Sequence, residues 1–374
     1  MPSVSRLSTR SVIKTAVKRV QRKLNSHVAQ QTEQIKQNTI MNMRKLFFIA
    51  AVAMACVACG KKAESKNETA ALVVETVAEK PVVYMTTDIS PEGLVRVYDA
   101  LGVVPTGKVA VKISTGEPGG NNFLQPSLIK DLVSKVNGTI VECNTAYTGP
   151  RYETESHLKV FEDHGFAAIA PIDLLDGTAE TRIPVKDTTH IKYNIVGANL
   201  LNYDWVVNLA HFKGHAMGGF GGVLKNQSIG IASANGKAYI HSAGAIEDKE
   251  VIWKHTAPQD KFIEAMAAAA QSVHDYFEGR MIYINVMNNL SVDCDCSAHP
   301  ADPEMKDIGI LASLDPVALD QACVDLVFNY PSSEGDDAAA LIERINSRHG
   351  IHILEHSAAI GLGSREYVLR TIDK

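Results

Sequence analysis

Three neighbouring segments decide the fold: KVAVKI at residues 108–113, PSLIKDLVSKV at 126–136 and TIVE at 139–142. The outer two are short and rich in Val, Ile and Thr, whereas the middle one repeats apolar residues at helical spacing. A similar pair precedes them, with a β-rich run at 82–85 and a helical pattern at 91–101. This alternation predicts a parallel sheet whose strands are joined by right-handed crossovers.

Later segments continue the alternation of strands and helices. The sequence predicts strands over 205–209, 281–285 and 308–313, and helices over 153–164, 261–277, 316–328 and 337–347. No linker rich in Pro, Gly or Ser interrupts residues 81–374. We therefore expect an α/β fold, with a mostly parallel sheet flanked by helices in a single compact unit that has room for two lobes.

Composition excludes several classes of protein. The chain has 374 residues, of which 45% are hydrophobic and 21% charged, unlike a disordered, collagen-like or polytopic membrane protein. The formal net charge of −5 is unevenly distributed, because residues 1–59 carry ten Lys or Arg and one acid, Glu33. The rest of the chain has 27 basic and 41 acidic residues. A body this acidic offers no electrostatic surface for nucleic acid, which we exclude as a partner.

Residues 41–59 are typical of a secretory signal. Basic residues at 44–45 precede an apolar run at 46–58, which is shorter than the roughly 20 residues that span a bilayer. Val57-Ala58-Cys59 is similar to a bacterial lipobox, although Cys56 stands where that motif usually has an aliphatic residue. We expect lipidation of Cys59. An ordinary signal peptide cut near Ala58, or an uncleaved anchor, remains the alternative.

These features predict a division of the chain. Residues 1–40 are basic and nearly free of acids, and we interpret them as an over-extended start that is not part of the mature protein. Residues 60–80 are polar and typical of a flexible tether. Residues 81–374 then form an α/β domain held at the cell envelope by a lipid anchor in the membrane, on either its periplasmic or its surface face.

Two polar loops follow successive predicted strands, at 114–122 and 143–151. Glycines let backbone approach a ligand, and Arg suits a carboxylate or a phosphate. We expect the loops to lie side by side at one end of the sheet and to bind an anionic group, although a flexible turn is the alternative for the first. The predicted ligand-binding residues are Gly116, Glu117, Gly119, Gly120, Asn144, Tyr147 and Arg151, and Lys225 from a later segment.

Paired His and Cys residues suggest chemistry. His211 and His215 are four residues apart, with Lys213 between them, and they precede a glycine-rich segment at 218–222. Cys294 and Cys296 are flanked by Asp293 and Asp295. We predict that His211, His215, Cys294 and Cys296 converge to hold zinc or iron through three or four ligands. Lys213 would act as a general acid or anion clamp, and one of the two Asp residues would support a His.

A redox pair is the competing interpretation of the cysteines, and a simple loop is the third. In the redox case Cys294 and Cys296 cycle between thiols and a disulfide while the His residues tune their pKa values. The catalytic candidates are Lys213, Cys294 and Cys296. Cys143 is expected to be a buried small residue rather than a nucleophile.

The ordered motifs resemble domain-of-unknown-function family number 362, over roughly residues 81–374. The matching segments are GEPG at 116–119, NTAYTG at 144–149, HFKGH at 211–215, GFGG at 219–222, LKN at 224–226, DCDC at 293–296, DIGILAS at 307–313, DPVA at 315–318 and GLGSREY at 361–367. Members are commonly labelled uncharacterised iron–sulfur centre proteins. Many carry a ferredoxin-like insert where this chain has residues 245–261 without cysteine. We therefore expect no ferredoxin-type 4Fe–4S cluster.

Two classes of function remain. The first is an envelope-anchored enzyme, metal-dependent or redox, that acts on a small anionic molecule. The second is a lipid-anchored protein that binds a small ligand without catalysis. The resemblance itself implies no known reaction.

Overall fold

The stretch that decides the fold forms the predicted strand–helix–strand unit. β2 (Val109–Lys112) pairs in parallel with β3 (Gly138–Glu142), and α3 (Pro126–Lys135) connects them. The computed structural model describes residues 79–373 of the protein. The predictions for residues 1–59, including lipidation of Cys59, lie outside the described residues, as do residues 60–78 of the predicted tether.

A mixed sheet forms the centre of the described residues, with the strand order β12-β1-β11-β10-β7-β2-β3-β4. β11 runs antiparallel to both of its neighbours, whereas the other strands run parallel to one another. The prediction of an α/β fold with a mostly parallel sheet is confirmed. The remaining strands of this sheet are β1 (Val82–Thr86), β4 (Ile172–Leu174), β7 (Trp205–His211), β10 (Met281–Met287), β11 (Gly309–Ser313) and β12 (Val368–Thr371).

The position of β1 differs from the sequence expectation, which placed it in one parallel series with β2 and β3. β11, β10 and β7 separate β1 from β2. On its other side β1 pairs in parallel with β12, and the Asp373 carboxylate accepts a hydrogen bond from the backbone N–H of Thr87 at 2.7 Å. Among residues 79–373, the first and last strands are therefore neighbours in the sheet.

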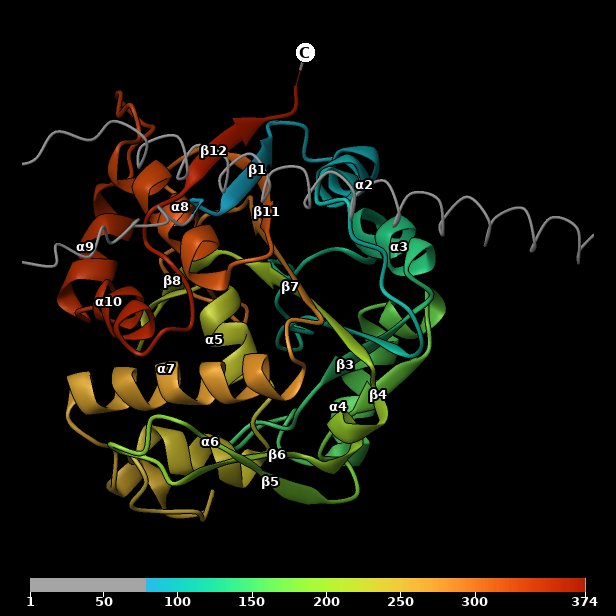
Figure 1. Cartoon of the computed structure of the whole chain (residues 1–374), viewed down its shortest axis with the longest axis vertical. Helices are drawn as coiled ribbons and strands as arrows, with labels where there is room; N and C mark the ends of the chain where they lie inside the picture. The colour runs from blue at the N-terminus through green and yellow to red at the C-terminus, as the bar shows by residue number, and fades with distance from the viewer. Residues whose placement is uncertain (1–78, 374) are drawn as a thin grey trace, which may run out of the picture. The chain divides into compact units, whose positions relative to one another are not determined.

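Helices cover both faces of the sheet (Figure 1). α2 (Pro91–Ala100), α3 and α4 (Thr154–Asp163) pack on one face, and α5 (Val223–Ser228) and α8 (Pro316–Phe328) pack on the other. β10 shows why both faces are covered, because Ile282 and Ile284 point to the first layer while Met281 and Tyr283 point to the second. A strand buried on both sides is apolar throughout, as in other parallel sheets.

Further elements extend the second layer. α7 (Gln259–Tyr276) lies against α5, and the hairpin β5 (Glu180–Pro184) and β6 (Tyr193–Gly197) packs beyond it with α6 (Ala234–His241) (Figure 1). The other elements are β8 (Lys213–His215), β9 (Gly219–Gly221), α9 (Ala339–Ser347), α10 (His352–Ala359) and the 3₁₀ turns Phe166–Ala168, Ala198–Asn202 and Ile252–Lys254. Within residues 79–373 no helix has the length and apolar character needed to cross a bilayer.

Candidate functional site

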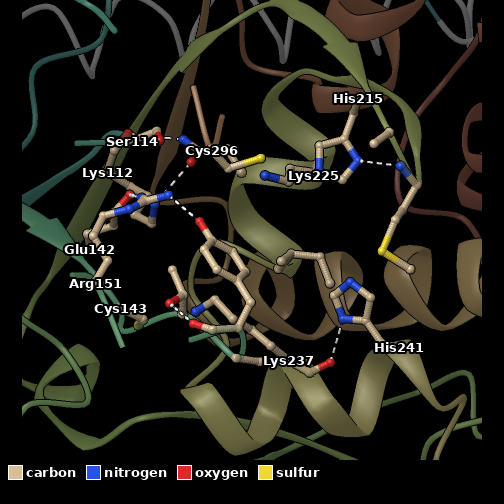
Figure 2. A pocket seen from close by; sticks show the side chains of 18 of the residues that line it. Lys112, Ser114, Glu142, Cys143, Arg151, His215, Lys225, Lys237, His241 and Cys296 are labelled. Atoms are coloured by element: carbon tan, nitrogen blue, oxygen red, sulfur yellow. Dashed lines mark hydrogen bonds and ion pairs between the residues drawn. The ribbon is translucent and has the colours of Figure 1, made fainter. Parts of the chain in front are cut away.

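A cavity of about 280 Å³ lies at the carboxyl ends of the parallel strands (Figure 2). Lys112 ends β2 and Glu142 ends β3, and both side chains line the cavity. Open α/β sheets place their ligand sites at this end of the strands. The position agrees with the sequence expectation that the polar loops after successive strands build the site.

Four cationic side chains line the cavity, against one carboxylate, Glu142. The cations are Lys112, Arg151, Lys225 and Lys237. Lys112 donates to the backbone oxygen of Ile113 at 2.5 Å and to Asn226 Oδ1 at 3.0 Å, and Lys237 donates to the backbone oxygen of Ala232 at 2.6 Å. This excess of positive charge makes the cavity suitable for an anion.

Burial weakens the charged forms of two of these lysines. It lowers the pKa of Lys112 to about 8. Burial, followed by the nearby charges of Lys112 and Arg151, also lowers the pKa of Lys225 to about 8. Crowded ammonium groups in a poorly solvated place repel one another. A bound anion would relieve that repulsion, so each lysine gains more from a ligand than an exposed lysine would.

Arg151 joins the two predicted loops but is held by carboxylates. Its Nε donates to Glu117 Oε1 at 2.8 Å, and its Nη1 lies 3.3 Å from Glu142 Oε1. Tyr147 donates to the same Glu117 carboxylate. The loops at 114–122 and 143–151 therefore do lie side by side. The guanidinium, however, is largely neutralised within the protein, rather than free for a ligand as we expected.

The Glu142 carboxylate is the centre of this buried network. It accepts a hydrogen bond from the backbone N–H of Thr115 at 3.1 Å, and its Oε2 lies 2.6 Å from His157 Nε2. Burial opposes its ionisation, but Arg151 and His157 together hold the pKa of Glu142 well below its usual value. Glu142 is therefore an anion with its own partners. The lysines remain the groups available to an anionic ligand.

The first glycine loop packs against the cysteine loop, which sequence analysis did not foresee. Glu117 donates its backbone N–H to the backbone oxygen of Asp295 at 3.0 Å. A Cβ on Gly120 would come within 3.5 Å of the Ser297 oxygen, and one on Gly116, where φ is +77°, would meet Phe123. Gly119, with φ +88°, has open space around its missing Cβ. Of the three glycines that we expected to bind a ligand, Gly116 and Gly119 allow the backbone to turn within the first loop, and Gly120 lets this loop pack against the cysteine loop.

Asn144, another predicted ligand-binding residue, makes hydrogen bonds within the protein. Its backbone N–H donates to Asp176 Oδ1 at 2.9 Å, its Nδ2 donates to Thr154 Oγ1 at 3.0 Å, and its Oδ1 lies 3.1 Å from His157 Nδ1. These contacts occupy both ends of the side-chain amide. Asn144 therefore positions the loop after β3.

His211 and Lys213 form a second ion-pair network around Asp295. His211 Nδ1 lies 3.1 Å from Asp295 Oδ2, and its Nε2 lies 2.8 Å from the backbone oxygen of Asn288. Lys213 donates to Asp295 Oδ1 at 2.6 Å and to the Asn122 oxygen at 2.7 Å. β7 ends at His211 and His215 ends β8, so the two histidines lie on different strands and no single helix or strand relates their side chains. His211 thus has the Asp partner that we expected for one of the histidines, and it lines a small pocket with Cys294 and Cys296, but it is not one of the three grouped ligands described next. The role of Lys213 as a general acid or anion clamp stays a prediction.

His215, Cys294 and Cys296 do come together. One ligand atom from each lies within 4.8 Å of the others, and His215 and Cys296 also line the cavity. Cys294 and Cys296 form a disulfide in this structure. In Figure 2 Lys225 is seen between Cys296 and His215, whereas Lys237 and His241 are seen at the opposite side. The group is compact enough to hold a metal ion once the cysteines are reduced.

The hydrogen bonds of His215 fix its tautomer. Its Nδ1 accepts from the backbone N–H groups of Gly218 at 2.9 Å and Met217 at 3.2 Å. Burial, followed by the charge of Lys225, holds the pKa of His215 well below its usual value, so the ring is neutral. A neutral ring whose Nδ1 accepts carries its proton on Nε2. That arrangement makes Nε2 a hydrogen-bond donor, and metal ligation there requires loss of the proton.

The family model for a domain of unknown function, DUF362, matches residues 109–325, which is more than half of the chain. The chain belongs to this family. Among curated proteins none matches. Of solved structures, the lactate racemase apoprotein from Thermoanaerobacterium thermosaccharolyticum is 13% identical with a TM-score of 0.40, covering 65% of this chain and 56% of that one. A Thermotoga maritima protein is 12% identical with a TM-score of 0.37, covering 72% and 58%.

The remaining cysteines of this DUF362 protein stay apart from the metal-sized group. Cys143 is buried, as predicted, and donates to the Ile231 oxygen at 3.2 Å. Cys323 is buried on α8 and accepts from Asn285 Nδ2 at 3.3 Å. Burial raises the pKa of both thiols, which makes them poor nucleophiles. Within the described residues, neither belongs to a group of three potential ligands.

Sequence reasoning missed several cavity residues of this DUF362 protein. Lys112 is the clearest case, because a lysine within the fully buried strand β2 is rare without a function or a partner. That signal was present in the KVAVKI segment. Lys237 and His241 lie on α6, where nothing in the spacing marks them, because only the fold brings that helix to the cavity.

Proposed function

We propose that the protein is an envelope-anchored redox enzyme that acts on a small anionic molecule. The lysine cavity binds the anion, and the Cys294–Cys296 pair exchanges two electrons with it. One observation carries the proposal: Cys296 lines the same cavity as Lys112, Lys225 and Lys237. A redox pair and a cationic binding site thus share one small space.

The shape of the cavity restricts the substrate. Its volume of about 280 Å³ lies at the small end for ligand sites, so it suits a molecule of only a few carbons. Tyr147 and Trp253 add apolar wall beside the lysines. A small thiol that carries carboxylates or a phosphate meets both requirements, because its charges can face the lysines while its carbon chain faces the aromatic rings.

The redox step balances as follows. A substrate thiolate attacks one sulfur of the pair, which breaks the Cys294–Cys296 bond and forms a mixed disulfide. A second substrate thiol then displaces the cysteine, so two substrate thiols lose two electrons and two protons as one substrate disulfide, and the protein gains two thiols. A second disulfide compound then reoxidises the pair and is itself reduced to two thiols. The neighbouring Lys225 favours the thiolate form of a reduced cysteine, which is the reactive form in such exchange.

The metal-dependent variant of this enzyme has weaker support at this site. A metal ion would need both cysteines as thiolates. It would also need His215 to lose its Nε2 proton, whereas the backbone N–H groups of Met217 and Gly218 donate to Nδ1 and so favour the tautomer that carries this proton. Those two backbone bonds favour the redox interpretation. The second candidate function is a lipid-anchored binding protein, which would use the same lysines without electron exchange.

Thiol oxidation and anion binding together test the proposal. Mercaptosuccinate, an anionic thiol, should be oxidised to its disulfide faster than uncharged 2-mercaptoethanol, with one protein disulfide reduced per product formed. Lys225→Ala should weaken succinate binding by about 10- to 100-fold, as for other bonds to charged groups. It should also remove the preference for the anionic thiol. Exposed Lys130→Ala on α3 is the matched control and should behave like the wild type.

Cys294→Ser/Cys296→Ser separates the two candidate functions. It should abolish thiol oxidation and leave succinate affinity, measured by calorimetry, within about twofold of the wild type. If the wild-type protein binds succinate but oxidises neither thiol, the enzyme proposal fails and the binding protein stands. If it does not bind succinate, sulfate or phosphate, the assignment of the cavity to an anion fails as well.

A further inference from the structure

A cluster of histidines and carboxylates lies outside the lysine cavity, around α10. His349 follows α9, while His352 begins α10 and Glu355 lies in its first turn. One potential ligand atom from each lies within 4.8 Å of the others. α10 packs beside α7, and Figure 1 shows it between α7 and α9. None of the three residues lines the cavity.

The two imidazoles are oriented by separate carboxylates on α7. His349 Nδ1 lies 2.7 Å from Asp260 Oδ1, and His352 Nε2 lies 2.9 Å from Glu264 Oε1. The nitrogens that face away from α7 are therefore His349 Nε2 and His352 Nδ1, and His352 Nδ1 is paired with Glu355. Histidines that bind metal almost always donate the other ring N–H to a carboxylate, a carbonyl or water. Both carboxylates are already in place.

The spacing of the ligand atoms also suits a metal. His352 Nδ1 lies 3.3 Å from Glu355 Oε2. Ligands bound about 2.0–2.2 Å from a tetrahedral zinc lie roughly 3.3–3.5 Å apart, so these atoms already have that separation. The rings of His349 and His352 are stacked, with centroids 4.9 Å apart. Because the two ring planes are only 5° from parallel, one imidazole must rotate before His349 Nε2 and His352 Nδ1 can point at the same ion.

The backbone holds His349 in position. Its φ of +51° is a left-handed conformation that His adopts more readily than branched residues do. Next to it, Gly350 packs against Gly219, where an added Cβ would lie 2.8 Å from Gly350 Cα. Gln259 donates to the oxygens of both Arg348 and Met217, each at 2.7 Å. The histidine turn is thus tied to the loop that carries the cavity residue Met217.

We propose that His349, His352 and Glu355 form a second site, which binds a divalent transition metal through two imidazoles, one carboxylate and water. Asp260 and Glu264 are its positioning residues. Binding replaces a proton on His352 Nδ1, which passes to solvent. The donor set of two His and one Glu suits zinc and other borderline divalent ions better than calcium or magnesium. This site is separate from the His215–Cys294–Cys296 group and does not depend on the proposed redox function.

Cobalt is the probe that separates the two groups, because cysteine ligation gives an intense sulfur-to-metal absorption in the near ultraviolet and His/Glu ligation does not. Co²⁺ is added to the full chain without an affinity tag, in the Cys294→Ser/Cys296→Ser background. We expect one Co²⁺ per chain, bound without the sulfur band. Zn²⁺ should displace it, and a large excess of Ca²⁺ should not.

Variants assign the bound ion to the proposed residues. His349→Asn retains a side chain that tolerates a positive φ, and it should abolish stoichiometric binding without lowering the melting temperature. Asp260→Asn should weaken Co²⁺ binding by about 10- to 100-fold, as other supporting carboxylates do. Exposed His255→Ala is the matched control and should bind like its parent. Unchanged affinity in both His349→Asn and His352→Ala, or no stoichiometric Co²⁺ in the parent, would overturn the proposal.

Discussion

At the scale of single residues, protonation of the cavity lysines governs what the protein can bind. Lys112 and Lys225 have pKa values lowered to about 8, chiefly by burial. Both are charged below that pH and neutral above it. An anion needs the ammonium form, so above pH 8 the lysines must take up protons when the anion binds.

Sulfate affinity is therefore expected to fall as pH rises. It should be nearly constant from pH 6 to 7 and then decrease above pH 8, by up to about tenfold per pH unit for each proton taken up. Sulfate keeps its charge throughout, so the protein alone sets the profile. Calorimetry in buffers of different ionisation enthalpy measures the proton uptake directly.

Lys225→Ala should reduce that uptake, whereas Lys130→Ala should leave it unchanged. An affinity that stays constant or rises between pH 7 and 9 would contradict the assignment of these lysines to the anion.

The sequence revealed some site residues and concealed others for identifiable reasons. Cys294 and Cys296 stood out because a cysteine pair between acids is unusual in a protein core. The spacing of His211 and His215 suggested one shared face, but β7 ends at His211 and β8 carries His215, so no single element relates the two side chains. Arg151 was identified as a cation and its loop was expected beside the Glu117 loop, but the spacing does not show that the Glu117 carboxylate points at the guanidinium.

At the scale of elements, glycines with the same backbone conformation differ in how closely their surroundings pack against them. Gly219 and Gly279 have almost the same backbone conformation, with φ of +81° and +80°. A Cβ on Gly219 would lie 3.0 Å from the Ile345 oxygen and closer still to Gly350 Cα, whereas nothing lies within 4 Å of one on Gly279. The pair separates the effect of conformation from the effect of close packing.

Gly279→Ala should cost about 1–2 kcal/mol of unfolding free energy, the usual penalty for a left-handed alanine. Gly219→Ala should cost about 1–3 kcal/mol more, because backbone must move to admit the methyl group. Urea denaturation measures both. Equal losses of unfolding free energy in the two variants would contradict this expectation, because they would show that the backbone around Gly219 and Gly350 moves apart without a measurable cost.

Element order was predictable where periodicity was strong. The helix Pro316–Phe328 was predicted with its observed bounds, and an Asp315 side chain caps its first turn. The reversed direction of β11 was not predictable, because a strand buried on both faces has the same apolar pattern in either direction. The hairpins β5–β6 and β8–β9 are short and partly glycine-rich, so their periodicity is too weak to detect.

At the scale of the whole molecule, the proposed anchor decides where the site operates. Cys59→Ala should release the protein from membranes or leave an unprocessed precursor, because two acyl chains hold a protein on a bilayer far more firmly than one. Membrane fractionation with mass analysis of the N-terminus measures this. Cys56→Ala is the matched control and should remain anchored. A processed Cys59→Ala protein that still sediments with membranes would refute the lipoprotein proposal.

The pairing of β1 with β11 and β12 affects how the protein folds during its synthesis. Thr86, at the end of β1, bonds Asp373, 287 positions later along the chain. During synthesis β1 therefore stays unpaired until β11 and then β12 have been made, more than 200 residues later. Such distant partners slow folding, because a long loop must close before the contact forms. Truncated or stalled products would lack the strands that cover β1, which leaves an unpaired edge that favours aggregation.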